Sequence, residues 1–203
     1  STASWSEGSL QLVSADSSIV NEAGATFNIT GTNRSMFSSG TFSNDGSVVV
    51  NLDAADQSVS VQPVFDSSGS IDAQQGRISL NGGGTNSGSI TGSADGVVAF
   101  GGGNHELTAA SSVNGANIEF NGGTIEVNGS YSAANTTIGF GTANINVTAQ
   151  TETLDITNGT IGGTGEMTAS GLTTFTSGNL ADDMVVRAEG GLDINSTSTK
   201  QLF

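Results

Sequence analysis

Pairs of apolar residues recur at a fixed interval through the middle of the chain. Between residues 77 and 147, one residue separates the two members of each pair, and each pair lies 20 residues from the next. The pairs are Ile78 and Leu80, Val98 and Phe100, Ile118 and Phe120, and Ile138 and Phe140. Successive side chains of a strand point to opposite faces, so this alternation predicts strands with one buried face.

A second set of apolar residues keeps the same interval. Leu107, Val127 and Val147 are again 20 residues apart. A period of this length is too short for a helical hairpin repeat and suits one turn of a β-solenoid. We therefore predict an all-β chain, a single-stranded parallel β-helix with about 20 residues per coil, in which like residues stack. The rings of Phe100 and Phe120 are expected to continue into Phe140 as one aromatic column.

A glycine-containing motif recurs between the apolar runs. It consists of a large apolar residue, two or three polar residues, glycine, one small residue and a second apolar residue. The cases are WSEGSL (5–10), FSSGTF (37–42), FDSSGSI (65–71) and FTSGNL (175–180). Glycine relieves tight bends that need positive φ. One coil is therefore expected to read as bend, short strand, bend and longer strand.

A longer repeat links the two ends of the chain. The cassette at residues 5–37 recurs at residues 175–203. We predict that residues 1–203 form one β-solenoid domain, and that this domain is one module of a tandem array whose neighbours join end to end.

Charge and composition limit the classes of partner that the chain could bind. The net charge is −15, from 19 acidic and 4 basic residues among 203. Such a surface repels phosphate backbones and anionic lipid, which argues against nucleic acid and membrane partners. No apolar run approaches the roughly 18 residues of a membrane helix, so we expect no membrane insertion. Cysteine is absent, and the Ser-, Thr-, Asn- and Gly-rich composition is typical of extracellular proteins.

The repeated segments resemble a family of very large bacterial surface and secreted proteins, the β-helical stalks of haemagglutinin-type and autotransporter-like adhesins. The segments are LNGGGTNSGSI (80–90), FGGGNHELTAASSV (100–113), FNGGTIEVNGSY (120–131), GTIGGTGEMTASGLTTFTSGNL (159–180) and STSTKQL (196–202). This resemblance implies a right-handed parallel β-helix, export to the cell surface or medium, and long arrays. It supplies no catalytic residues.

Two groups of carboxylates are the candidate ligand or cation sites. In the 20-residue frame Glu106 and Glu126 stack one above the other, with Asn146 next. The second group is the pair Asp182 and Asp183, in a predicted turn, where hard oxygen ligands would suit calcium. The calcium nonapeptide of β-rolls does not occur, and solvated carboxylates are the favoured interpretation. We therefore expect no cofactor.

The single histidine, His105, falls in the inward column of Ile125 and Ile145. A packed, hydrogen-bonded histidine is favoured over a metal ligand or a base beside Glu106, because the sequence has no second histidine.

The leading hypothesis is a non-catalytic structural or adhesive module, a stalk or spacer of an extracellular or cell-surface protein. The first alternative is a carbohydrate-binding module that docks glycans, including those of a host cell surface, on one face of the solenoid. A polysaccharide-active enzyme is a weaker alternative, because the four basic residues are scattered and no paired carboxylates gather beside them. Ice binding is weaker still, because it needs a long, regular file of threonines.

Overall fold

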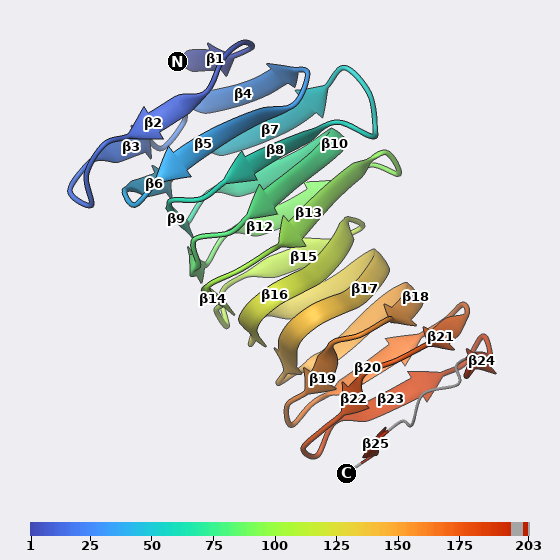
Figure 1. Cartoon of the computed structure of the whole chain (residues 1–203). Coiled ribbons are helices and arrows are strands. Elements are labelled where there is room, and N and C mark those ends of the chain that lie inside the picture. The colour runs from blue at the N-terminus through green and yellow to red at the C-terminus, as the bar shows by residue number, and fades with distance from the viewer. Residues whose placement is uncertain (196–200, 203) are drawn as a thin grey trace.

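The fold is a parallel β-solenoid, as the sequence predicts, and no helix occurs among the described residues. A computed structural model describes residues 1–195 and 201–202. Its 25 strands pair in parallel as one continuous sheet that winds through about ten turns. Figure 1 shows the coils stacked in chain order, with the first and last coils at opposite ends of the stack. The right hand implied by the resemblance stays a prediction.

Each coil contributes one strand to each of three faces, which we name A, B and C. Face A contains β1 (Thr2–Trp5), β4 (Thr26–Gly31), β7 (Ser47–Leu52), the start of β10 (Ser70–Leu80), β12 (Ser89–Gly92), β15 (Ser112–Asn114), the start of β17 (Ser130–Ile145), the start of β18 (Thr148–Ile156), β20 (Glu166–Ala169) and β23 (Val185–Ala188). Face B contains β2 (Leu10–Leu12), β5 (Arg34–Ser38), β8 (Ser58–Val61), the end of β10, β13 (Gly96–Phe100), the start of β16 (Asn117–Val127), the middle of β17, the end of β18, β21 (Thr173–Phe175) and β24 (Leu192–Asp193). Face C contains β3 (Ser18–Asn21), β6 (Thr41–Asn44), β9 (Val64–Ser67), β11 (Gly84–Asn86), β14 (Asn104–Leu107), the end of β16, the end of β17, β19 (Thr160–Gly162), β22 (Asn179–Leu180) and β25 (Gln201–Leu202).

The coil therefore has three strands and three corners, not the two strands expected from the sequence. Glycine-rich and hydroxyl-rich strands such as β11 carry little apolar alternation, because only one residue of Gly84–Asn86 is buried. The pattern of apolar pairs therefore does not predict a strand of this kind.

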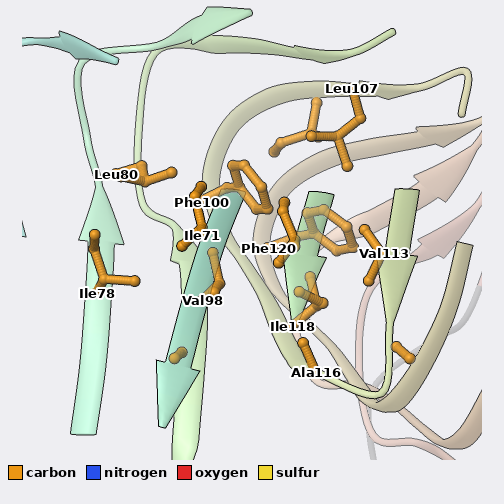
Figure 2. Close-up of a cluster of buried hydrophobic side chains, with 14 of the residues drawn as sticks. Ile71, Ile78, Leu80, Val98, Phe100, Leu107, Val113, Ala116, Ile118 and Phe120 are labelled. Atoms are coloured by element: carbon orange, nitrogen blue, oxygen red, sulfur yellow. The ribbon is translucent and has the colours of Figure 1, made fainter. Parts of the chain in front are cut away.

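The core is a column of inward side chains that runs the length of the stack. Ile78, Val98 and Ile118 are register partners in successive coils, as are Leu80, Phe100 and Phe120. All six are almost completely buried. Figure 2 shows these residues converging between the strands, with Leu107 and Val113 closing the other sides. The predicted 20-residue frame is thus confirmed over these coils.

The frame is wrong for the last predicted pair. Ile118 pairs with Thr136 and Phe120 with Ile138, each 18 residues on, and Phe140 is 59% exposed. The cause lies at the corner between faces C and A. That corner has four residues, 108–111, between β14 and β15, but only residues 128 and 129 between β16 and β17. Two residues fewer in the coil move Ile138 to the column position that the sequence assigned to Phe140.

The same shortening changes the second predicted column. Leu107 pairs with Val127 as expected, but Val127 then pairs with Ile145 in place of Val147. Val147 is partly buried and packs against the edge of the core. A shift of two residues keeps the inward and outward faces of a strand, so the core survives with different members.

The structure contains the predicted aromatic column, but the ring that follows Phe120 is not the predicted one. The rings of Phe100 and Phe120 are stacked with centroids 5.7 Å apart. Beyond Phe120 the next ring is that of Tyr131, at 6.4 Å, and not that of Phe140. Tyr131 lies on face A and reaches the column from a neighbouring side of the coil.

The recurring glycine motif marks corners of every kind. Trp5 ends β1 on face A, whereas Phe175 ends β21 on face B. The two cassettes therefore begin at different corners of the coil, and their likeness reflects a shared bend. Residues 196–200 and 203 of the second cassette, with most of the segment at 196–202, lie outside the described residues. The tandem array stays a prediction.

Candidate functional site

An open polar groove on face C contains the first carboxylate pair predicted from the sequence. Its volume is about 460 Å³. It is lined by Gly84, Thr85, Asn104, His105, Glu106, Thr124 and Glu126. A second hollow of about 310 Å³ continues from Thr85 toward the N-terminal coils and includes Asp45 and Asp66. Face C thus presents a hydroxyl- and carboxylate-lined surface across several coils.

Glu106 and Glu126 are register partners on β14 and β16, so the predicted stacking is observed. The next register partner is Asn144, however, and not Asn146, because of the same two-residue shortening. Both amides still reach Glu126: Asn144 Nδ2 donates to Oε1 at 2.6 Å and Asn146 Nδ2 to Oε2 at 3.0 Å. Each carboxylate oxygen of Glu126 therefore accepts a hydrogen bond from an amide.

His105 lies beneath the groove and its ring belongs to the core. The residue is 4% exposed, and its ring packs edge-on against Phe100 at 5.0 Å. Nε2 donates to the carbonyl oxygens of Gly102 at 2.9 Å and Leu80 at 3.2 Å. Burial lowers the pKa of His105 below its ordinary value, against the opposing effect of these two hydrogen bonds. This geometry matches the packed histidine favoured by the sequence.

His105 pairs with Ile125, as the frame predicts, but the next partner in that column is Ala143 and not Ile145.

Asp182 and Asp183 lie far from the glutamate pair. They occupy the corner between β22 and β23, and both are exposed. Asp182 adopts a positive φ of 57° and accepts a hydrogen bond from the Gly163 amide at 3.3 Å. Within the described ranges, no three histidine, aspartate or glutamate side chains gather as a metal site. The structure thus does not unite the two candidate groups into one centre.

An ion pair on face B escaped the sequence analysis, which treated the basic residues as scattered. Arg77 Nη2 donates to Glu119 Oε1 at 2.6 Å, and Arg77 Nη1 donates to Glu119 Oε2. The two residues are separated by 42 positions, with β13 between their strands. The available signal was this spacing, which is close to two coil lengths.

The sequence pattern also did not predict a buried file of polar residues at the end of face C. Asn21 Nδ2 donates to Asn44 Oδ1 at 2.7 Å, and Asn44 Nδ2 donates to Ser67 Oγ at 3.0 Å. Asn86 is the next register partner, but in the described structure neither atom of its amide finds a hydrogen-bond partner. The spacing of 23 residues between Asn21 and Asn44 was the signal that could have revealed the file.

The fold and this polar surface define the class of the protein as a parallel β-solenoid with an open, hydroxyl- and carboxylate-bearing face. No protein-family model, curated protein or solved structure matches the chain. No helix in the described part of the chain could span a membrane. The groove offers hydrogen-bond donors and acceptors over an extended surface, which suits an extended polar ligand better than a compact one.

Proposed function

We propose that the chain is a non-catalytic structural module, a stiff spacer of a large extracellular or cell-surface protein of bacterial origin. The observation that carries this proposal is the continuity of the fold. Three parallel ladders and one apolar column run through about ten coils, so every coil is held by its neighbours on three faces. Bending such a rod would stretch hydrogen bonds on one face and compress the packed core on the opposite one.

Neighbouring solenoid modules are the proposed partners at the two ends of the rod. Strands β1, β2 and β3 each pair with a single described strand, as do β23, β24 and β25. Each of these strands therefore has one edge whose backbone groups could extend a ladder, which is the kind of edge that repeat proteins cover with an adjoining unit. Module-to-module contact would continue the rod without a flexible joint.

Stiffness is tested by the distance distribution between two spin labels. The chain has no cysteine, so Val13→Cys and Leu172→Cys create two unique and exposed labelling sites near opposite ends. At about 4.8 Å per coil, a rod holds the two labels roughly 40 Å apart along its axis. One narrow distribution near this distance supports the spacer. A broad distribution, or a much shorter mean distance, overturns it.

Catalysis is tested separately on neutral and uronate-containing polysaccharides. We expect no new reducing ends or unsaturated products after prolonged incubation. The glutamate pair supports this expectation, since Glu126 accepts amide hydrogen bonds on both oxygens and the groove residues include neither Arg nor Lys. Release of a product that Glu106→Gln abolishes would establish an enzyme instead.

The second candidate function is glycan binding on one face of the rod, with neutral or host-cell glycans as ligands. The polar groove of face C favours it. A glycan array probed with and without calcium tests it, because a calcium-bridged site at Asp182 and Asp183 would show binding only with the ion, whereas direct recognition would not need it.

A further inference from the structure

One aromatic side chain stands apart from all others that the structure describes. Phe140 is 59% exposed at the corner between faces B and C, whereas the other described aromatic side chains are buried or partly buried. The shortened coil placed Ile138 in the core and left Phe140 outside it. Exposure of a phenyl ring to water carries a free-energy cost that a polar residue at this corner would avoid.

A hydrogen-bond acceptor with a fixed direction belongs to the residue paired with Phe140. Asn121 is the register partner of Phe140 in the preceding coil. Its Nδ2 donates to Glu119 Oε2 at 2.6 Å, and Glu119 is itself held by Arg77 through a hydrogen bond of 2.6 Å. The ion pair therefore orients the amide: the nitrogen faces Glu119, and the carbonyl oxygen Oδ1 faces the next coil.

Gly139 leaves room for that oxygen. A Cβ atom at position 139 would lie only 2.2 Å from Asn121 Oδ1, which no real side chain allows. Glycine at this position thus lets the amide extend over the backbone immediately before Phe140. The result is an acceptor of fixed direction over the residue before an exposed phenylalanine, at a point where the pairing of β16 with β17 shifts register on both sides of Asn121.

We infer that Phe140 and Asn121 form a subsite for a neutral sugar, which deepens the glycan-binding candidate and rests on it. The negative face of the phenyl ring attracts the weakly positive C–H groups of a pyranose ring. A hydroxyl of the same ring donates to Asn121 Oδ1. The net charge of −15 disfavours uronates, sulfates and phosphates, so the sugar is uncharged.

A protein partner fits this patch less well. Stable protein interfaces bury about 800 Å² on each partner and centre on clustered apolar anchors. Phe140 is a single ring, and its neighbours at the corner are glycines and the polar Asn121. A single ring beside one oriented amide matches the size of one sugar unit.

Calorimetric titration of the full chain with cellohexaose, laminarihexaose, mannohexaose and maltohexaose tests the subsite, with oligogalacturonate as the anionic comparison. We expect at least one neutral hexaose to bind and oligogalacturonate not to bind. Phe140→Ala should weaken that binding about tenfold or more, and Phe140→Trp should retain it. Gly139→Ala should also weaken it, because the added methyl group displaces the amide of Asn121.

The control is Leu172→Ala, which removes another exposed apolar side chain, 48% exposed, from the same rod. It should leave the affinity unchanged, and all variants should unfold at the wild-type temperature. Binding that survives Phe140→Ala overturns the subsite while leaving glycan binding elsewhere on the rod intact. Failure of every neutral hexaose to bind overturns the subsite too, and the spacer function then stands on the spin-label distances alone.

Discussion

At the scale of single residues, two phenylalanine positions with equal places in the 20-residue pattern have opposite environments. Phe120 is 0% exposed in the apolar column, whereas Phe140 is 59% exposed. The pattern of alternating apolar residues cannot distinguish them, because both stand next to polar or small neighbours on either side. Their difference comes from the length of a corner that neither residue belongs to.

Replacing Ile118 with aspartate should prevent folding. The new carboxylate would lie unpaired in a narrow core, at a cost of more than about 4 kcal/mol. Circular dichroism with thermal unfolding measures the result, and the matched control is Phe140→Asp, which should change stability by no more than about 0.5 kcal/mol. The register would be refuted if the aspartate at position 118 left the unfolding temperature unchanged.

His105 should make stability depend on pH below neutrality. Its folded-state pKa lies below the unfolded value of 6.5, so the unfolded chain binds the extra proton first. The contribution to stability is complete above about pH 6.5 and decreases as the pH falls toward the folded-state pKa.

The chain has one histidine, so a single imidazole signal in a proton NMR titration reports the folded-state pKa directly. Denaturant unfolding at several pH values should show a shallower loss of stability between pH 6.5 and 5 in His105→Gln than in the wild type. Equal slopes in the two proteins, or an NMR midpoint above 6.5, would contradict the buried neutral imidazole.

At the scale of elements, the ladders carry polar as well as apolar files. The Asn21, Asn44 and Ser67 file is buried at the end of face C, where the chain turns toward face A. Asn44 Nδ2 also donates to the Ser70 carbonyl, so the file joins one coil to the start of the next. A buried polar file of this kind stabilises only where each amide finds its partners.

Two substitutions in this file should therefore have different effects. Asn44→Ala leaves the partners of Asn44 unsatisfied in a buried site, and should cost about 2–4 kcal/mol. Asn86→Leu removes an amide with no partner among the described residues and should be neutral or stabilising, since its next register partner is Leu107. Urea unfolding measures both. A large loss of stability in Asn86→Leu would show that its amide is satisfied in solution.

At the scale of the whole molecule, charge opposes the stacking of coils. The described residues contain two ion pairs, Arg77 with Glu119 and Arg187 with Glu166, against a net charge of −15. Arg187 is exposed and Glu166 is partly exposed, and their mutual hydrogen bond lowers the pKa of the glutamate. Exposed pairs of this kind contribute little, so repulsion among the remaining carboxylates dominates the electrostatics.

Added salt should thus stabilise the rod. Raising sodium chloride from 10 to 300 mM shortens the Debye length from about 30 Å to about 6 Å and screens the repulsion between coils. The midpoint of thermal unfolding at pH 7 should rise by a few degrees, measured by differential scanning calorimetry. Replacing sodium with calcium at equal ionic strength is the control for specific ion binding. A midpoint that falls with salt would show that ion pairs, and not repulsion, govern stability.

The sequence by itself determined the β-solenoid class and its period, because each coil of a solenoid repeats the same pattern of buried positions. Equivalent positions meet the same environment once per coil, so Ile78, Val98 and Ile118 repeat the same apolar residue type at one interval. The stacking of Glu106 on Glu126 followed from the same interval. Local order of this kind needs no knowledge of distant contacts.

Only the tertiary structure decided where the period changes and what lies at the corners. Corner length depends on how the chain bends around the core and does not appear in the apolar pattern, so the shift that exposes Phe140 could not be read in advance. The Arg77–Glu119 pair and the orientation of Asn121 required side chains from different coils to meet in space. Such contacts depend on register between coils, and register was settled by packing.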